Sequence, residues 1–380
     1  MKIVIAIDSM KGSLSSLEAG NAAREGILRV CPDADVSVFP VADGGEGTVD
    51  ALVSAKGGRI RQVTVSDPLG RKITASYGLL GDKKAVIEMS SAAGLPLLKA
   101  EERNPLAATT FGVGEMIVDA IGQGCTDFVI GIGGSATNDG GIGMLSALGF
   151  DLLDEKGNPV PFGAVGAEKI ARISDAHVLP SLASCSFRVA CDVTNPLCGE
   201  NGCSAVFGRQ KGADDKMIAR MDAALARYAE IVKKRNPDAD PAFPGAGAAG
   251  GIGFAFLSFL NAGLVGGIDL ILRELKLEEP IANADFVITG EGKLDGQTSM
   301  GKTPVGVAKI AKRFGKPVIA LAGCLADSAF LCREKGIDAM FPILRSPLSL
   351  SEAMEKETAA KNTANAAEEI FRLLAAVKKR

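Results

Sequence analysis

The chain of 380 residues has no tryptophan, only two tyrosines and a single histidine, His177. It therefore offers few aromatic rings for stacking on bases or sugars. None of its eight cysteines are spaced as C-x-x-C, whereas structural zinc sites usually draw on closely spaced ligand pairs. We expect free thiols in a reducing compartment, and alternation in "CSFRVAC" favours a buried strand face. A zinc site is the alternative, with ligands from four cysteines near His177: Cys185, Cys191, Cys198 and Cys203.

Blocks of like charge are absent, and the formal net charge is −3. This charge pattern points to neither nucleic acid nor an anionic membrane as a partner. The apolar run after Lys2 is shorter than the core of a signal peptide, about 7–15 residues, so we expect a cytoplasmic protein. Residues 241–268 carry no charge but include eight glycines and Pro244. They predict a glycine-rich loop and a buried helix rather than a membrane span.

The length suggests about two or three domains, and 47% apolar with 23% charged residues is typical of a globular protein. Apolar strands alternate with helices at both ends of the chain, which predicts a parallel sheet covered on both faces. The middle contains antiparallel strands that turn at Gly81-Asp82. We therefore expect an α/β fold in two parts: a doubly wound domain, residues 1–65 plus 284–380, and an inserted mixed α/β domain, residues 66–283.

The strand order of the doubly wound domain predicts where a ligand binds. In a 2-1-3-4-5 order the first strand and the strand at residues 285–290 are neighbours, and the order reverses between them. Ligands bind at such a reversal, beyond the carboxyl ends of the strands. The loops 8–13 and 290–298 should lie there. The inserted domain should face the same crevice, which places the site in a cleft between the domains.

Five glycine-rich polar loops stand out: residues 8–13, 42–48, 131–143, 191–196 and 290–298. Glycine lets backbone amides approach a ligand closely, and such loops at helix starts suit phosphate or carboxylate. Carboxylates among anion-binding amides indicate a divalent cation shared with phosphate groups. About half of these acids should instead cap helices, Asp43 and Asp139 foremost. The loops carry seven acids: Asp8, Asp43, Glu46, Asp139, Asp192, Glu291 and Asp295.

Residues 296–304, "GQTSMGKTP", match the P-loop pattern G-x-x-x-x-G-K-[ST]. In a P-loop the first glycine directly follows the strand, but here the strand is expected to end near Gly290. The sequence also shows no apolar strand that ends in an aspartate, as the Walker-B motif of P-loop proteins requires. We interpret the match as accidental, although Lys302 could lie near anionic ligand groups.

The chain closely resembles the bacterial class I glycerate kinases. The similar stretches run in family order from residue 3 to about 308: "IAIDSMKGSLSS", "PVADGGEGT", "GIGGSATNDGGIGML", "CDVTNPLCGENG", "VFGRQKGA", "PGAGAAGGIGF" and "DFVITGEGKLDGQTSMGKTPVGVA". The resemblance implies an ATP-dependent kinase that phosphorylates D-glycerate, with a flavodoxin-like domain, an inserted second domain and no P-loop. It further implies 2-phosphoglycerate as the product. The oligomeric state stays open between a monomer and a homodimer.

Phosphoryl transfer requires positioning, charge neutralisation and an acceptor for the hydroxyl proton. Because the only histidine lies outside every glycine-rich loop, we expect that acceptor to be a carboxylate, Asp192 first and Asp295 next. Lys11 joins them as a catalytic candidate and, with Ser13 at a helix start, could hold the carboxylate of glycerate. Further substrate contacts are expected from Asp8, Asp43, Glu46 and Asn195. Mg²⁺ is assigned to Glu291 and Asp295, and the ATP phosphates to the loop residues Gly133, Gly134, Ser135, Thr137, Asn138 and Asp139.

Two other function classes remain to be weighed. A nicotinamide-dependent dehydrogenase would also use glycine loops, but Ala136 stands where G-x-G-x-x-G requires its third glycine, and no acidic strand end follows about 20 residues on. A non-catalytic protein that binds small acids would not need seven carboxylates, which repel an anion when no cation is present. An assay with ATP, Mg²⁺ and D-glycerate distinguishes the three.

Overall fold

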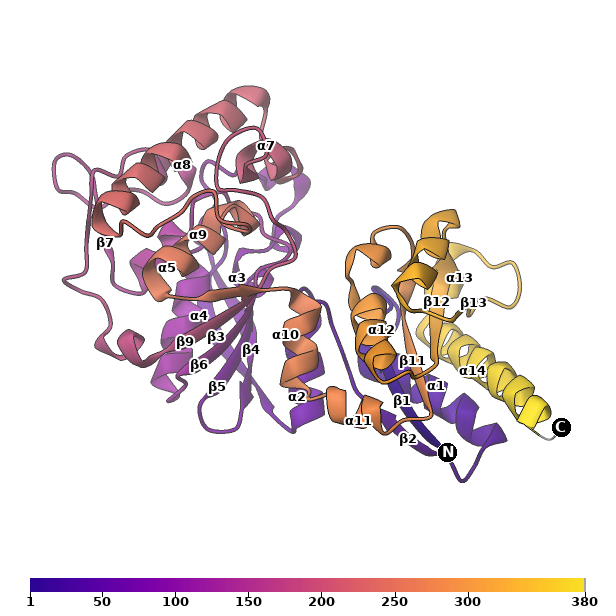
Figure 1. Ribbon diagram of the computed structural model, residues 1–380. Coiled ribbons are helices and arrows are strands. Elements are labelled where there is room, and N and C mark those ends of the chain that lie inside the picture. Colours follow the sequence, from indigo (N-terminus) through magenta and orange to yellow (C-terminus); the bar gives the residue numbers. More distant parts are fainter. Residues whose placement is uncertain (379–380) are drawn as a thin grey trace. The chain divides into compact units, whose positions relative to one another are not determined.

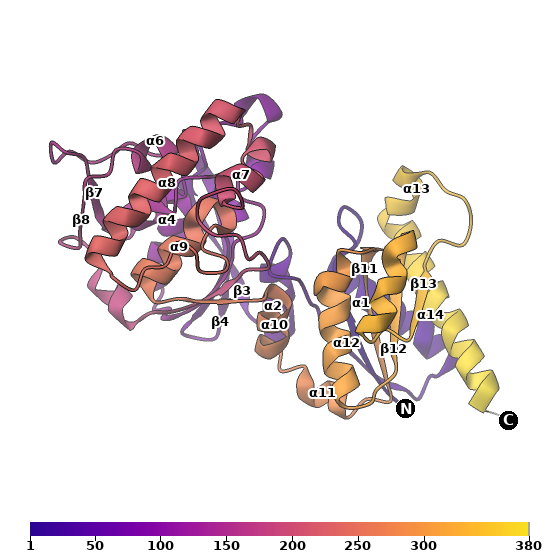
Figure 2. The same ribbon diagram turned by 45° about the horizontal axis from the view of Figure 1, so that its top comes forward.

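The computed structural model describes residues 1–378, and these form two compact units. Unit 1 comprises Met1–Asp43, Asp50–Gly57 and the chain from Ile268 onwards, whereas unit 2 comprises Gly44–Val49 and Gly58–Gly267. Figures 1 and 2 show the elements of each unit from two directions. Each unit has its own sheet and its own hydrophobic core.

Unit 1 is built on a five-stranded parallel sheet of order β13-β12-β11-β1-β2. In chain order this is 2-1-3-4-5, so the predicted flavodoxin-like order and its reversal between β1 and β11 are confirmed. The central strands are apolar because both faces of the sheet are covered. The strands are β1 (Lys2–Ile7), β2 (Asp35–Val38), β11 (Phe286–Leu294), β12 (Val318–Leu325) and β13 (Ala339–Pro342).

Helices cover this sheet on both faces (Figure 2). Helices α1 and α14 pack together against β1 and β12, and α12 contacts β11 and β1. The helical segments of unit 1 are α1 (Ser16–Val30), α10 (Gly267–Glu274), α11 (Glu278–Ala282), α12 (Thr303–Arg313), α13 (Leu350–Met354) and α14 (Lys356–Lys378), with 3₁₀ turns at Thr298–Met300 and Asp327–Lys335. Helix α2 (Thr48–Lys56) begins in unit 2 and continues into unit 1.

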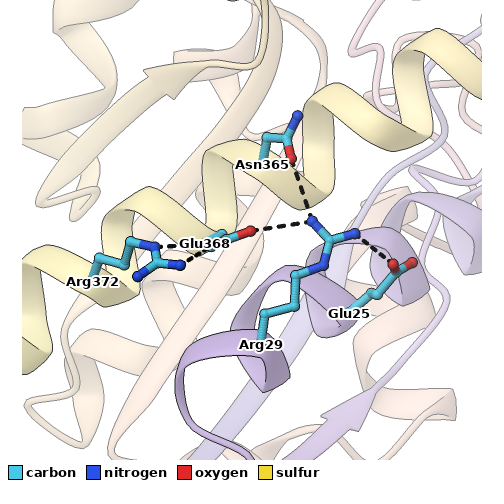
Figure 3. A network of polar contacts seen from close by, with 5 residues as sticks. All are labelled: Glu25, Arg29, Asn365, Glu368 and Arg372. Atoms are coloured by element: carbon cyan, nitrogen blue, oxygen red, sulfur yellow. Dashed lines mark hydrogen bonds and ion pairs between the residues drawn. The ribbon is translucent and has the colours of Figure 1, made fainter.

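The contact between α1 and α14 combines a close backbone approach with a polar network. A Cβ atom on Gly26 would lie well under 3.0 Å from the carbonyl oxygen of Ala364, so only glycine lets the two backbones come this near. Beside it, Arg29 donates to Glu25 and to Glu368, with N–O distances of 2.6 and 3.2 Å (Figure 3). Arg372 also donates to Glu368 within α14, at 2.7 Å. These exposed ion pairs add little stability singly, so the close helix packing dominates.

Unit 2 is built on a six-stranded mixed sheet of order β10-β9-β6-β5-β4-β3. Four of its strands are parallel and β3 and β4 are antiparallel, as the alternating pattern and the turn at Gly81-Asp82 predict. A separate pair of short strands, β7 and β8, forms a second sheet. The strands are β3 (Arg59–Ser66), β4 (Lys72–Leu80), β5 (Lys84–Glu88), β6 (Asp127–Gly131), β7 (Asp151–Leu153), β8 (Arg172–Ser174), β9 (Ser186–Ala190) and β10 (Gly263–Val265).

Helices of unit 2 pack around this sheet and enclose a large apolar core. The α-helices are α3 (Ser90–Ala93), α4 (Phe111–Gly122), α5 (Ile142–Ala147), α6 (Ala164–Ala167), α7 (Cys203–Phe207), α8 (Asp215–Arg235) and α9 (Ala248–Leu260), and the 3₁₀ turns are Leu95–Leu97, Ala100–Glu102, Pro180–Ser184 and Arg209–Lys211. Helix α9 lies within the uncharged segment 241–268 and is buried, as predicted. Among the residues described, no helix has the length and apolar character needed to cross a membrane.

The cysteines behave as the sequence predicts, since all eight are free. Phe187 and Val189 of β9 are buried, and Cys185 and Cys191 at its two ends pack against the same core. No group of three or more His, Cys, Asp or Glu side chains within residues 1–378 is arranged to hold a metal ion by itself.

The compact units follow a different partition from the predicted domain boundaries. Residues 59–65 are predicted to lie in the first domain, but they form most of β3, which pairs with β4 and belongs to unit 2. Residues 268–283 were assigned to the insertion, yet they belong to unit 1. Near the C-terminus, Glu355 has non-helical angles of φ −58° and ψ 133° and separates α13 from α14. Residues 379–380 of the predicted first domain lie outside the described part of the chain.

Candidate active site

In unit 1, Asp8 stands at the point where the strand order reverses. It directly follows β1, and its amide donates to the carbonyl of Gly290 in β11 at 2.8 Å. The carboxylate is buried, with 8% of the residue exposed. It accepts hydrogen bonds from the Thr303 hydroxyl and from the Ser9 amide, both at 2.6 Å. Thr303 begins α12, so one carboxylate links the ends of two neighbouring loops.

Burial raises the pKa of Asp8 to about 6, and the nearby Asp43 carboxylate adds to this rise. The Thr303 hydroxyl, the Ser9 amide and the Lys11 charge oppose it. A carboxyl group that titrates near neutral pH can accept or release a proton under working conditions. Such a shift in a buried group is typical of functional sites.

Glu291 lies on the part of β11 that extends past Gly290. Its carboxylate accepts the Thr298 hydroxyl at 2.5 Å. Burial raises the pKa of Glu291 to about 7, and the Asp8 and Asp295 carboxylates add to the rise. The three acids therefore form one electrostatic cluster in unit 1, with Lys302 as a nearby cation.

Asp295 behaves in the opposite way. Desolvation would raise its pKa, but the amides of Gln297 and Thr298, together with Lys293 and Lys302, hold it below its ordinary value. The two amides donate to Oδ1 at 2.9 and 3.3 Å. A weakly basic, ionised carboxylate suits a cation better than it suits proton abstraction.

This acidic cluster fits a Mg²⁺ ion that also binds phosphate. Glu291 and Asp295 repel each other, and a divalent cation would relieve that repulsion. Mg²⁺ usually takes one or two carboxylates together with phosphate oxygens and water.

The P-loop match at residues 296–304 needs a new explanation. The expected strand end near Gly290 is wrong, because β11 continues to Leu294, two residues before Gly296. The spacing between strand and glycine therefore does not exclude a P-loop. The hydrogen bonds of the backbone amides in this loop do exclude it. Those of Gly296, Gln297, Thr298, Met300, Gly301 and Lys302 all donate within the chain, to Ser328, Asp295, Gln297 and Thr298. A P-loop directs such amides at phosphate, so the match is accidental for a structural reason.

Lys11 and Ser13 do not lie at a helix start, contrary to the prediction. Helix α1 begins at Ser16, and Ser15 caps it in a reciprocal box with Glu18. Lys11 and Ser13 instead lie in the turn bounded by the Met10–Leu14 bridge. Lys11 is exposed, and the buried Ser13 hydroxyl has no hydrogen-bond partner in the described chain. Both residues remain close to Asp8 in sequence. The capping box of Ser15 and Glu18, and not Lys11 or Ser13, occupies the start of α1.

In unit 2, the loop after β6 has an open rim and a buried base. Gly133 and Gly134 are exposed, and Gly134 has a positive φ of 75°. The amides of Gly133, Gly134 and Ser135 donate to no acceptor within residues 1–378. Consecutive amides without acceptors form an anion-binding surface. This is the arrangement that the 296–304 loop lacks.

Asp139 has a structural position, although it was predicted to bind the cofactor. It is fully buried and accepts the amides of Thr110, Gly141 and Gly143 as well as the Thr110 hydroxyl. Burial raises its pKa, and these hydrogen bonds oppose the rise. Its carboxylate thus joins the starts of α4 and α5, in keeping with the alternative prediction that it caps a helix.

Thr137 and Asn138 are also fully buried, and Thr137 Oγ1 and Asn138 Oδ1 have no partner in the described chain. Asn138 Nδ2 donates to the Ser204 hydroxyl of α7 at 2.8 Å. Lys211 donates to Ser135 Oγ at 2.9 Å and to the Thr137 carbonyl at 2.6 Å.

Sequence reasoning missed Lys211 and Ser204. The only signal was their place in or next to the family-like stretch "VFGRQKGA", and most lysines in a sequence are exposed.

A left-handed turn supports the same loop. Ala249, Gly250 and Gly251 have φ values of 52°, 72° and 92° at the start of α9. The carbonyl of Gly250 accepts the amide of Gly140, and a Cβ on Gly250 would collide with the Thr137 carbonyl. Ala249 adopts this conformation without glycine's freedom, which is a strained arrangement typical of functional regions.

The remaining predicted residues in unit 2 lie on loops at the carboxyl edge of its sheet. Asp192 follows β9, is exposed, and accepts the Gly267 amide at 2.7 Å. Asn195 donates to the Asn201 carbonyl at 2.9 Å. Glu46 is exposed on the loop 44–49, which packs against this edge: Gly44 lies beside Ala190, and a Cβ on Gly131 would meet Gly44. Asp192, Glu46 and the glycine loop therefore share one edge.

Parallel strands whose carboxyl ends carry such loops are typical of α/β enzymes that bind anionic ligands. The family model described as "Glycerate kinase family" matches residues 3–375, and this chain belongs to that family. It is 49% identical to glycerate 2-kinase of Escherichia coli over 93% of both chains, and 47% identical to glycerate kinase of Haemophilus influenzae over 99% of both. A crystal structure of a Salmonella typhimurium protein assigned as glycerate kinase 2 has a TM-score of 0.92, at 46% identity over 100% of both chains.

The family match confirms the predicted membership, and the chain is therefore an enzyme of the kinase class. It also decides against the dehydrogenase and the non-catalytic binding protein. The differences between the predicted and the observed site thus concern the roles of single residues and leave the class of enzyme unchanged.

Proposed function

We propose that this enzyme transfers the terminal phosphoryl group of ATP to the 2-hydroxyl of D-glycerate, giving 2-phosphoglycerate and ADP. The observation that carries the proposal is the match to the glycerate kinase family over residues 3–375, with polar loops at the carboxyl ends of parallel strands in both units. The Escherichia coli relative named glycerate 2-kinase supports the choice of hydroxyl.

The glycine loop of unit 2 is the proposed site for the ATP phosphates. Its rim offers the amides of Gly133, Gly134 and Ser135, which have no acceptors in the described chain. Thr137 and Asn138 lie beneath the rim and shape it, and Asp139 fixes the loop to α4 and α5 without facing solvent. The loop therefore binds phosphate through its backbone, and its buried side chains hold that backbone in place.

The acidic cluster of unit 1 is the proposed site for Mg²⁺ and part of the substrate site. Glu291 and Asp295 would hold the ion, which when bound neutralises charge on the phosphates. Asp8 and Asp43 would contact the hydroxyls of glycerate, and Lys11 and Ser13 its carboxylate. Glu46 and Asn195 of unit 2 remain proposed substrate contacts. That this site lies in a cleft between the two domains stays a prediction.

Asp192 remains the proposed general base. It is exposed at the carboxyl edge of β9, on the unit that also carries the glycine loop. Asp8 replaces Asp295 as the second candidate, because its pKa of about 6 suits proton transfer, whereas hydrogen bonds keep the pKa of Asp295 low. In either case the carboxylate takes the proton of the 2-hydroxyl as that oxygen attacks phosphorus and ADP leaves.

The test measures ADP formation with ATP, Mg²⁺ and D-glycerate, and then adds enolase without a phosphoglycerate mutase. Enolase accepts 2-phosphoglycerate only, so immediate formation of phosphoenolpyruvate identifies the 2-kinase. ADP formation without an enolase product would mean phosphorylation of the 3-hydroxyl. Absence of ADP with D-glycerate, while another hydroxy acid gives ADP, would overturn the substrate assignment.

A further inference from the structure

Lys211 is a buried cation that forms no direct ion pair in the described chain, although the buried Asp139 carboxylate lies near enough to favour its charge. Only 2% of the residue is exposed. Its ammonium group donates to Ser135 Oγ at 2.9 Å and to the Thr137 carbonyl at 2.6 Å, and neither acceptor carries a full charge. A buried charge is costly unless it is paired, and an isolated buried lysine is rare. The ammonium group of Lys211 is therefore hydrogen-bonded only to neutral oxygens, and an anionic ligand nearby would stabilise its charge further.

The residues around Lys211 hold it next to the glycine loop. The 3₁₀ turn Arg209–Lys211 follows α7, and Gly212 ends it with a φ of 94°. A Cβ on Gly212 would collide with the carbonyl of Arg103, so this turn requires glycine. The preceding helix α7 supplies Ser204, which accepts Asn138 Nδ2 at 2.8 Å. The segment from Ser204 to Lys211 thus contacts the glycine loop at two places, through Ser204 at Asn138 and through Lys211 at Ser135 and Thr137.

The exposed rim of the same loop carries backbone amides that have no hydrogen-bond acceptor in the described chain. The amides of Gly133, Gly134 and Ser135 have none among residues 1–378. Below them, Thr137 Oγ1 is buried and without a partner there as well. Amide donors without acceptors, close to a buried cation that forms no direct ion pair, match a ligand that brings several negative oxygens, which is the chemistry of a phosphate chain.

We propose that Lys211 is the positioning residue of the phosphate loop: its ammonium group fixes the Ser135–Thr137 segment and supplies the positive charge that attracts the phosphates of ATP and ADP. The inference rests on the proposed function, because it names how that site selects a nucleotide. Lys211 acts through Ser135 and the loop backbone, so it affects nucleotide binding more than glycerate binding.

Burial lowers the pKa of Lys211 to about 8, and Cys203 of α7 and Asp139 of the loop oppose this fall. These are the titratable groups that face it. The Cys203 thiol has its pKa raised to about 11 by burial, so it stays neutral well above pH 8. Asp139 is held by four donors of the chain. Loss of the Lys211 proton should therefore weaken nucleotide binding as the pH rises through about 8.

The experiment compares Lys211→Met, Lys211→Arg and the control Lys216→Met, since Lys216 is exposed on the next helix. We expect Lys211→Met to raise the KM for ATP and the Kd for ADP by roughly 30-fold, while the KM for D-glycerate changes less than about 3-fold. Lys211→Arg should restore part of the affinity, and Lys216→Met should match wild type. An ADP affinity of Lys211→Met within about 3-fold of wild type, or equal rises in both KM values with a lower melting temperature, would overturn the proposal.

A measurement without mutation covers the case in which Lys211→Met does not fold. Calorimetry of ADP binding to the wild-type protein from about pH 7.5 to 9.5 should show affinity falling above pH 8, and a flat profile would overturn the proposal. Binding of ADP needs no turnover. A wild-type protein that binds ADP but does not phosphorylate D-glycerate would therefore contradict the proposed reaction and leave the role of Lys211 standing.

Discussion

The Thr303 hydroxyl donates to Asp8 Oδ2 at 2.6 Å, and this bond joins residues 295 positions apart in the chain. It connects the end of β1 with the first residue of α12, across the reversal of the strand order. The Thr303 hydroxyl and the Ser9 amide both donate hydrogen bonds to the buried Asp8 carboxylate. Burial nevertheless disfavours its ionised form, which raises its pKa.

Asp8→Asn should stabilise the protein above pH 6 while it impairs the reaction. The folded-state pKa of about 6 exceeds the ordinary value of 3.8, so between these values the folded state holds a proton that the unfolded state has lost. Stability of the wild type therefore falls as pH rises from about 4 to 6, by roughly 2–3 kcal/mol. Asparagine cannot ionise, its oxygen can still accept the Ser9 amide, and its Nδ2 can donate to the Thr303 hydroxyl. Thermal melts at pH 4 and pH 8 check this, with a gain expected only at pH 8.

Asp295→Asn is the matched control for that experiment. Its folded-state pKa lies below the ordinary value, so its ionised form favours folding above that value. The control should therefore lower the melting temperature at pH 8, with the loss disappearing at acid pH. Equal responses of the two variants would contradict the assigned electrostatics.

Asp192→Asn should lower kcat by about 10²–10⁴-fold with little change in either KM, because it removes the proposed base. The asparagine oxygen can still accept the Gly267 amide, so the fold should persist. Steady-state kinetics on Asp192→Asn and Asp8→Asn decide between the two candidate bases. Near-normal kcat in Asp192→Asn rejects its assignment, and a loss confined to Asp8→Asn transfers the role to Asp8.

Gly26→Ala should destabilise unit 1 by about 2 kcal/mol or more, although alanine normally favours a helix over glycine by about 1 kcal/mol. The new Cβ would collide with the Ala364 carbonyl and force α1 away from α14. Gly122→Ala in α4 is the control, since its Cβ would meet nothing within 4 Å. Chemical denaturation should show opposite signs for the two variants, and a stabilised Gly26→Ala would contradict the close packing.

Ala249→Gly should raise the free energy of unfolding by about 0.5 kcal/mol, because glycine adopts a φ of 52° without the penalty that alanine bears. Ala219→Gly, at an exposed position within α8, should instead cost about 1 kcal/mol. Denaturation curves of both variants test whether the left-handed turn is strained. A loss of stability in Ala249→Gly as large as that in Ala219→Gly would show that it is not.

Periodic and turn signals predicted much of the fold because they are local. Apolar strands alternating with helices gave the parallel sheet of unit 1 and its order, and the Gly81-Asp82 turn gave the β4–β5 hairpin. The unit boundaries were harder to place. Whether Arg59–Ser66 joins one sheet or the other depends on which strand it pairs with, and β4 is a partner that no pattern within residues 59–66 can specify.

The sequence by itself determined the family, the positions of the glycine loops and the acids they carry, because these are properties of short segments. Only the tertiary structure decided what each group does. It buried Asp139 beneath two helix starts, occupied the amides of the loop that matches a P-loop, and brought Lys211 under Ser135, 76 positions away. The physical reason is that burial and hydrogen-bond partners depend on contacts distant in sequence, and these set whether a charge is structural or available to a ligand.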